Sequence, residues 1–304
     1  MKLGLVTSIL DQSDFKEMID IVAENGLDCV EVACWPAGKA ERRYAGVSHI
    51  DTESLTQEKA DELNAYASSK GVEISALAYY PNPLDENPEK RRLAIDHLYS
   101  VIDAAALLEV NMVTTFIGRM PSKTVSENLA EVAKVWTPIV KHAEEKNVKI
   151  AIENCPMLFT EDEWPGGQNL MTTPALFRKV FEVLDSDHIG LNFDPSHFVW
   201  QQMDYIKPLY EFKDKLFHVH YKDIKVYPEK LADVGIMATP LQYMSPKLPG
   251  LGDVDWGKYV SALTDIGYAG YTCIEVEDKA FEKDYAAVKT SVRQSAHYLR
   301  NFVQ

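Results

Sequence analysis

The sequence predicts a single (β/α)₈ barrel, in which eight parallel strands alternate with eight helices around a closed sheet. Three observations lead to this prediction. Short β-branched, apolar runs alternate with longer helical patterns along the whole chain. There are eight such runs, and no repeat, low-complexity tract or linker divides them. The length of 304 residues fits one barrel, so we assign residues 1–304 to one domain.

The expected strands are short and apolar, as buried parallel strands are. They span residues 2–7, 29–34, 73–79, 112–118, 149–154, 189–194, 216–223 and 271–277. The expected helices span residues 13–25, 56–70, 88–108, 124–146, 173–184, 201–213, 255–266 and 285–302.

Two of the expected helices carry clear end signals. Ser13 is the expected N-cap of the first helix, and Gly26 supplies the left-handed stop. Thr173 is the expected N-cap of the fifth helix, with Pro174 at the first helical position, where its missing N–H costs nothing.

Net charge, apolar runs and cysteine spacing limit the binding partners and the cellular compartment that we expect. The formal net charge of −15 disfavours binding to nucleic acid or to an anionic membrane surface. The N-terminal apolar run is too short for a signal peptide, and no run of 18 apolar residues occurs. The four cysteines stand singly, which argues against disulfides and a thiolate zinc site. We expect a cytoplasmic protein.

Polar residues stand where the later strands end. In a (β/α)₈ barrel the working groups lie at the carboxyl ends of the strands. Side chains alternate faces along a strand, so those at the ends can share one barrel mouth, and His218 lies on the same face as His220. The candidates are Glu153, Asp194, His220 and Glu275.

Three acids and an imidazole in one mouth predict a divalent metal. Each residue alone has an ordinary structural explanation: a strand-end Asp caps helices, a strand His packs in a core, and Glu275 could pair with Lys279. Together, three buried carboxylates require a cation. The oxygen-rich set suits manganese first, with magnesium and cobalt as alternatives and zinc not excluded.

Several motifs resemble the xylose-isomerase-like (β/α)₈ superfamily of sugar isomerases and epimerases. They are "DPSH" with Asp194 and His197, "HVH", "LPGLGDVDW" and "GYAGYTCIEVE". The resemblance covers essentially the whole chain. It implies a metal held by Glu153, Asp194, His220 and Glu275, with His197 and Trp35 near a sugar or cyclic-polyol substrate.

In the ketose 3-epimerase branch, the glutamates that correspond to Glu153 and Glu275 also move the substrate proton. The implied reaction is proton abstraction next to a carbonyl through a metal-stabilised enediolate. The chain departs from this branch at Phe159 and Val226, where those epimerases carry a glutamate and an arginine.

These differences from the ketose 3-epimerase pattern leave a second interpretation of the activity. "HVHYKD" followed by "PGLGDVDW" also resembles inosose dehydratases, in which Lys222 and Asp223 would flank the metal. His218, on the same strand face as His220, is expected to line the mouth or to support the ligands. The alternative activities are therefore dehydration of a keto-polyol and cleavage of a 3-keto-C-glycoside by a deglycosidase catalytic subunit.

Two further classes are weaker alternatives. Type IV apurinic endonucleases share the barrel and a D-x-x-H, but their three-zinc site uses more histidines. Here Arg119 stands where another histidine ligand would be wanted, and the net charge opposes DNA binding. A barrel that binds without chemistry would not need two acids placed for proton transfer.

Three long insertions follow strands and could select the substrate. The first carries Lys39, Arg42 and Arg43, which either bind an anionic group or pair with surface acids. The second, with Trp164, Gly166 and Gly167, could form a flap or an ordinary loop. The third, residues 224–254, carries Met237 and Met244, which either pack on the barrel or contact another subunit in a homo- or hetero-oligomer.

Overall fold

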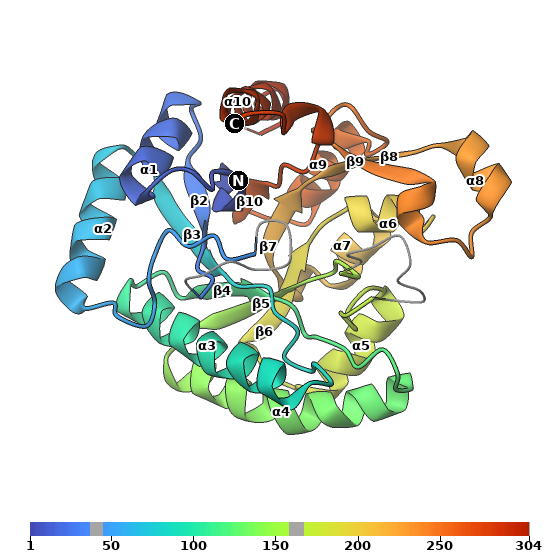
Figure 1. The fold of residues 1–304 in the computed structure, drawn as a ribbon, viewed down its shortest axis with the longest axis horizontal. Helices are drawn as coiled ribbons and strands as arrows, with labels where there is room; N and C mark the ends of the chain where they lie inside the picture. Colours follow the sequence, from blue (N-terminus) through green and yellow to red (C-terminus); the bar gives the residue numbers. More distant parts are fainter. Residues whose placement is uncertain (37–44, 158–166, 304) are drawn as a thin grey trace.

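Eight strands form a closed parallel barrel in the computed structural model, which describes residues 1–36, 45–157 and 167–303 (Figure 1). All eight expected strands are confirmed. Their order around the barrel is β1, β2, β3, β4, β5, β6, β7 and β10, which closes back on β1. The strands span Lys2–Val6 (β1), Cys29–Ala33 (β2), Glu73–Ala78 (β3), Met112–Thr115 (β4), Lys149–Glu153 (β5), Ile189–Phe193 (β6), Leu216–Tyr221 (β7) and Tyr271–Ile274 (β10).

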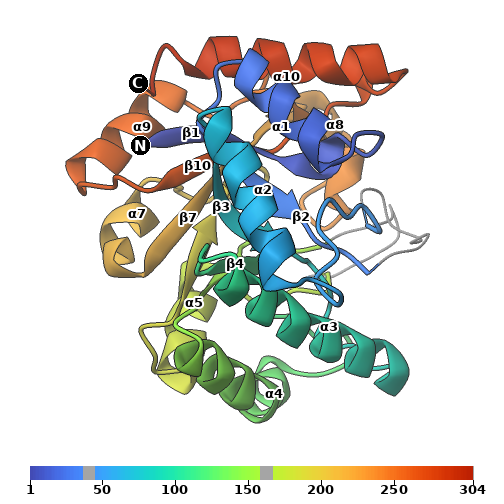
Figure 2. The same ribbon diagram turned by 90° about the vertical axis from the view of Figure 1, so that its left-hand side faces the viewer.

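Helices surround the barrel, and Figure 2 shows α10, α1, α2, α3 and α4 following one another along its outside. Seven of the eight expected helices are confirmed within three residues at each end. They are α1 (Phe15–Glu24), α2 (Gln57–Ser69), α3 (Pro88–Leu107), α4 (Val125–Glu145), α5 (Pro174–Val183), α9 (Trp256–Asp265) and α10 (Tyr285–Leu299).

The helix end signals are confirmed with one correction. Thr173 accepts a hydrogen bond from Leu176 N at the start of α5, and Gly26 follows α1 with φ +65°. The N-cap of α1 is Asp14, whose side chain accepts from Glu17 N, and not Ser13. The hydroxyl of Ser13 instead bonds to Tyr285 OH, which ties the helix start to α10.

The expected helix at 201–213 is wrong. The structure has two five-residue helices, α6 (Ser196–Trp200) and α7 (Lys207–Glu211), separated by a turn and followed by the 3₁₀ helix η2 (Lys213–Lys215). Gln202 takes φ +59°, which ends α6. Asp204 Oδ1 then accepts from the backbone of Ile206 and Lys207, a local bond that opens a new helix instead of extending the old one.

The insertion after β7 contains structure that the sequence pattern did not predict. Strands β8 (Asp223–Val226) and β9 (Met244–Lys247) pair antiparallel over four residues. Between them lie α8 (Pro228–Val234) and the 3₁₀ helix η3 (Pro240–Gln242), and α8 projects away from the barrel in Figure 1. Asp253 accepts from Val226 N at 2.8 Å and so binds the end of the insertion to β8.

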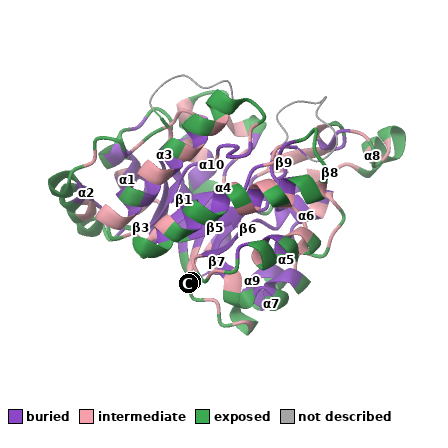
Figure 3. Ribbon diagram, turned by 90° about the horizontal axis from the view of Figure 1, so that it is seen from below, coloured by how far each residue is buried: buried purple, intermediate pink, exposed green. Residues whose placement is uncertain are grey.

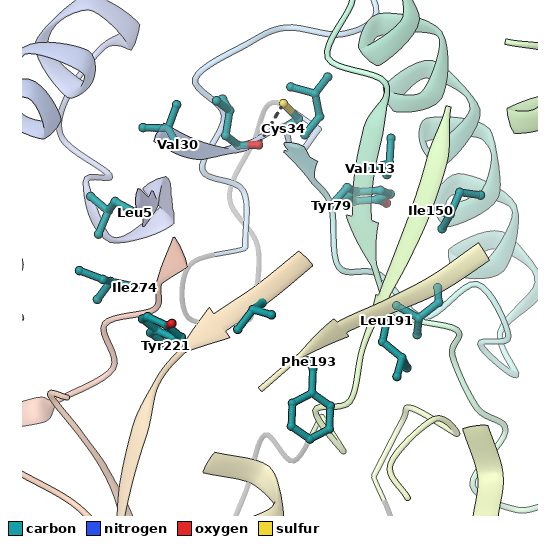
Figure 4. Packing of buried hydrophobic residues seen from close by; sticks show 14 of the residues in the cluster. Leu5, Val30, Cys34, Tyr79, Val113, Ile150, Leu191, Phe193, Tyr221 and Ile274 are labelled. Atoms are coloured by element: carbon teal, nitrogen blue, oxygen red, sulfur yellow. Dashed lines mark hydrogen bonds between the residues drawn. The ribbon is translucent and has the colours of Figure 1, made fainter. Parts of the chain in front are cut away.

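Alternation along the strands separates two sets of side chains. Outward residues such as Leu5, Ile150, Leu191 and Ile274 belong to the large apolar core of the molecule (Figure 4). Figure 3 shows the barrel strands buried and the outer faces of the helices exposed. Among the inward residues, Val6, Cys29 and Cys273 form a separate small apolar cluster.

Three further expectations concern loops and spans. Lys39, Arg42 and Arg43, like Trp164 and Gly166, lie outside the described residues. Among the residues described, all four cysteines are unpaired. No helix within the described ranges has the length and apolarity needed to cross a bilayer.

Candidate active site

Four side chains from consecutive strands converge at the mouth of the barrel. Glu153 ends β5, Asp194 follows β6, His220 lies in β7 and Glu275 follows β10. One ligand atom of each lies within 4.8 Å of those of the other three. His220 Nδ1 is 3.6 Å from Glu153 Oε1 and 3.4 Å from Glu275 Oε2. We call these four residues the acid–histidine cluster.

The inner atoms of the acid–histidine cluster have no hydrogen-bond partner among the described residues. These atoms are Glu153 Oε1, Asp194 Oδ2 and His220 Nδ1, and all three are buried. Burying a charged oxygen without a partner costs several kcal/mol, and three mutually repelling carboxylates add to that cost. A divalent cation at their centre would remove both penalties. The cluster therefore has the composition, spacing and unsatisfied atoms of a divalent metal site.

Glu31 decides which nitrogen of His220 faces the acids. Its Oε2 lies 2.6 Å from His220 Nε2, and both side chains are buried. A carboxylate only accepts hydrogen bonds, so Nε2 carries a proton, and in the neutral ring Nδ1 is the nitrogen with the lone pair. Nδ1 is the atom that points toward Glu153 and Glu275. This is the carboxylate–histidine arrangement that orients metal-binding imidazoles.

Glu31 is itself held by hydrogen bonds. Tyr80 OH donates to Oε1 at 2.5 Å and Thr114 Oγ1 donates to the same atom at 2.9 Å. Burial raises the pKa of Glu31, but the charges of His220 and His218 outweigh it and lower the pKa. Sequence reasoning missed Glu31. The available signal was an acid inside the otherwise apolar strand "CVEVAC".

Lys222 joins the cluster to a further acid, Glu277. Its Nζ lies 3.3 Å from Glu275 Oε2 and 2.7 Å from Glu277 Oε2, and only 4% of its side chain is exposed. Burial lowers the pKa of Lys222, but the charges of Glu275 and Glu277 raise it well above its usual value. Lys222 is therefore a buried ammonium ion next to the cluster.

The two glutamates of the cluster differ in acidity. Burial raises the pKa of Glu153, but the imidazoles of His197 and His220 outweigh this and lower it. The pKa of Glu275 is raised by burial, which the charge of Lys222 only partly offsets. Two carboxylates whose environments push their pKa values apart are suited to opposite roles in proton transfer.

His197 faces the cluster as a hydrogen-bond donor. Trp200 Nε1–H donates to its Nδ1 at 3.4 Å, so the proton of a neutral His197 lies on Nε2. Nε2 is 3.2 Å from Asp194 Oδ2 and 3.5 Å from Glu153 Oε1, without forming a hydrogen bond. This N–H is placed to meet an oxygen of a bound molecule.

A cavity of about 620 Å³ lies above the cluster. Glu153 and Glu275 line it, as do three of the residues expected at the substrate: Trp35, His197 and Lys222. Its polar side includes Tyr80, Cys155 and Glu277. This volume lies within the range of roughly 300–1,000 Å³ that is typical of small-molecule sites.

Two expected substrate residues lie elsewhere. His218 is buried one layer deeper, with Nδ1 3.0 Å from Asn192 Oδ1 and Nε2 3.1 Å from Ser75 Oγ. Its Nδ1 is also 3.5 Å from Glu31, so it supports the group that orients His220. Because side chains alternate along a strand, Asp223 points away from Lys222.

The carboxylate of Asp223 accepts hydrogen bonds from the loop that precedes α9. The donors are the backbone N–H groups of Gly250, Gly252 and Val254 and Nε1 of Trp256. Neither His218 nor Asp223 is among the described residues that line the cavity. Asp223 thus binds the loop and His218 contacts the group that orients His220, and substrate contact by either residue stays a prediction.

Comparison with known proteins shows the family of the chain. Residues 19–302 match the model of the xylose isomerase-like TIM barrel. The chain belongs to the xylose isomerase-like TIM barrel family. It is 27% identical to the uncharacterized protein YfiH of Bacillus subtilis (strain 168), over 96% of this chain and 97% of that protein.

Two of the proteins to which the chain is similar have named activities. An inosose dehydratase of Clostridium tetani (strain Massachusetts / E88) is 26% identical, over 50% of this chain and 48% of that protein. The structure of a D-psicose 3-epimerase with D-tagatose, from Clostridium cellulolyticum H10, superposes with a TM-score of 0.70 over all of both chains, at 16% identity. At that identity the superposition shows a shared fold.

Proposed function

We propose that the protein is a divalent-metal-dependent isomerase or epimerase of a sugar or cyclic polyol. The observation that carries this proposal is the acid–histidine cluster, whose buried inner atoms lack hydrogen-bond partners and face one another at the cavity floor. Glu153, Asp194, His220 and Glu275 would hold the ion, with manganese as the expected metal. When bound, the ion would polarise a carbonyl and the neighbouring hydroxyl of the substrate.

Each side chain around the cavity would have its own role in the proposed reaction. Glu153 and Glu275 would act as base and acid on opposite faces of the substrate: one would take the proton from the carbon next to the carbonyl, and the other would return one. His197 Nε2–H would donate to a substrate oxygen, and the Lys222 ammonium would offset negative charge that develops there. Trp35, which lines the cavity, would contact the sugar ring.

Exchange of the carbon-bound hydrogen with solvent deuterium tests this proposal. Glu153→Gln and Glu275→Gln keep the shape of each side chain but remove the proton carrier. In D₂O, the manganese-loaded protein should exchange one carbon-bound hydrogen of a ketose or inosose in an NMR assay, and both variants should lose that exchange. Undiminished exchange in both variants would contradict proton transfer by the two glutamates. Circular dichroism of each variant checks that the fold is retained.

Dehydration of a keto-polyol, or elimination from a 3-keto-glycoside, is the second candidate. It begins with the same proton abstraction but expels a leaving group. The buried Lys222 ammonium beside Glu275 favours this candidate, because a cation near the leaving oxygen would stabilise its charge. The likeness to inosose dehydratase points the same way. NMR analysis of products from ketoses, inososes and keto-glycosides separates the two reactions.

A further inference from the structure

Tyr80 lies between the cavity and the carboxylate that orients His220. It follows β3 in the chain and is one of the residues that line the cavity. Its hydroxyl donates to Glu31 Oε1 at 2.5 Å. The carboxylate of Glu31 also contacts Thr114, His218 and His220, and none of these three lines the cavity. Among the described residues, Tyr80 is therefore the one that joins the cavity surface to Glu31.

The side chain of Tyr80 is fixed at its ring and at its hydroxyl. The ring packs against Phe116, which follows β4, with the two ring centroids 4.8 Å apart. Asn192 Nδ2 donates to the hydroxyl oxygen at 3.1 Å. Because that hydrogen bond uses a lone pair of the oxygen, the single O–H of Tyr80 is left to donate to Glu31. The hydroxyl therefore has a defined direction.

Two donors hold the same oxygen of Glu31. Thr114 Oγ1 donates to Oε1 at 2.9 Å, while the other oxygen, Oε2, lies at His220 Nε2. Rotation about the last torsion of a glutamate side chain is soft, so the bonds at Oε1 set the direction of Oε2. The Tyr80 hydroxyl is 3.4 Å from His220 Nε2, which is too long for a strong hydrogen bond. Its main contact is therefore Glu31.

We propose that Tyr80 is a positioning residue of the metal site, which acts on the ion through Glu31 and His220 without being a ligand. The inference rests on the proposed function, because it takes the acid–histidine cluster as the place of the ion. It adds that a hydroxyl from the cavity surface holds the carboxylate that orients the imidazole.

Tyr80→Phe tests this inference, because it keeps the ring and removes only the hydroxyl. Mn²⁺ affinity, measured by calorimetry, should fall about 3- to 10-fold. This is less than is usual for residues that orient metal ligands, since Thr114 still holds Oε1. The electron paramagnetic resonance spectrum of the bound Mn²⁺ should also change, because its shape depends on the arrangement of the ligands. A tyrosine that only fills space would leave affinity and spectrum unchanged, and that result would overturn the inference.

Tyr210→Phe is the matched control. Tyr210 OH donates to Asp265 Oδ2 at 2.8 Å, which is the same kind of hydrogen bond, but Tyr210 lies on α7 and is 47% exposed. This variant should bind Mn²⁺ as the unaltered protein does. An equal loss of affinity in the two variants would show that the effect does not come from the metal site, and the inference would be wrong.

A double-mutant cycle tests whether Tyr80 acts through Glu31. In Glu31→Gln the amide has one acceptor, which His220 Nε2–H takes, and its NH₂ group cannot accept from Tyr80. Adding Tyr80→Phe to Glu31→Gln should therefore change Mn²⁺ affinity less than about two-fold. Losses that simply multiply would show that Tyr80 acts on the ion by another route, against the inference. Thr114→Val, which removes the other donor to Oε1, should resemble Tyr80→Phe.

The unaltered protein separates this inference from the proposed function. If it does not bind Mn²⁺, the proposed function fails first. If it binds Mn²⁺ and Tyr80→Phe binds the ion equally well, only the role of Tyr80 is wrong and the metal-dependent reaction stands. Circular dichroism of the metal-free variants checks that their fold is retained.

Discussion

Glu31 Oε2 and His220 Nε2 lie 2.6 Å apart inside the barrel, although 189 residues separate them in the chain. Glu31 comes from β2 and His220 from β7, so the contact crosses the barrel interior. It leaves His220 Nδ1 as the nitrogen that faces the three acids of the cluster. The orientation of the only imidazole in the acid–histidine cluster thus depends on a residue outside it.

Glu31→Gln should weaken metal binding. An amide can still accept a hydrogen bond from Nε2–H, but without its charge it makes the imidazole a weaker ligand. We expect Mn²⁺ affinity to fall by about 10- to 100-fold, as for other residues that orient metal ligands, with little change of fold. Calorimetry or electron paramagnetic resonance of Mn²⁺ would measure this. The control is Glu73→Gln on β3, which removes an exposed ion pair with Lys2. Equal Mn²⁺ affinity of the two variants would contradict the role of Glu31.

Metal should stabilise the fold. A ligand that binds only the folded state at 100 times its Kd adds about 2.7 kcal/mol, and each kcal/mol raises Tm by roughly 2–4 °C in domains of 150–250 residues. After dialysis against a chelator, Mn²⁺ should therefore raise Tm by several degrees in a thermal melt. Asp194→Ala removes one carboxylate of the cluster and should abolish most of the increase. An equal increase in this variant would show that the ion binds elsewhere.

Asp223→Asn should loosen the loop before α9. The Asp223 carboxylate accepts hydrogen bonds from the backbone N–H groups of Gly250, Gly252 and Val254. In asparagine one of the two oxygens is replaced by an amide nitrogen, which cannot accept these hydrogen bonds. The expected loss is about 3 kcal/mol of unfolding free energy. Hydrogen exchange at residues 250–254 should become faster. Asp253→Asn, whose carboxylate is half-exposed, should cost about 1 kcal/mol. A smaller loss of unfolding free energy for Asp223→Asn than for Asp253→Asn would contradict the role of Asp223 in holding the loop.

Two glycines should respond to alanine in opposite directions. A Cβ on Gly4 would lie 2.4 Å from the carbonyl oxygen of Cys29 on the neighbouring strand, so Gly4→Ala must push β1 and β2 apart. We expect a loss of about 1–3 kcal/mol. Gly257 lies inside α9, and a Cβ there would meet no atom closer than 3.5 Å. Gly257→Ala should stabilise the protein by about 0.5 kcal/mol, because alanine restricts the unfolded chain. Urea titration of both variants provides the comparison.

The fold was predictable because its signals are local. A short apolar run of residues predicts each barrel strand, and a longer amphipathic pattern predicts each confirmed helix. The prediction failed where local signals compete. Residues 201–213 look helical in composition, but Asp204 bonds to the backbone two and three residues ahead and splits the segment. The β8–β9 pair joins segments some twenty residues apart, and no hairpin turn marks it.

By itself, the sequence determined the barrel and brought Glu153, Asp194, His220 and Glu275 to one mouth. Strand alternation and the common direction of parallel strands are enough to place strand-end residues together. Only the tertiary structure decided that Glu31 reaches His220, that Asp223 binds a loop, and that the insertion lines the cavity with apolar side chains. These contacts join segments far apart in the chain, and their partners are set by the closure of the barrel and the course of the insertion, which no local pattern of residues encodes.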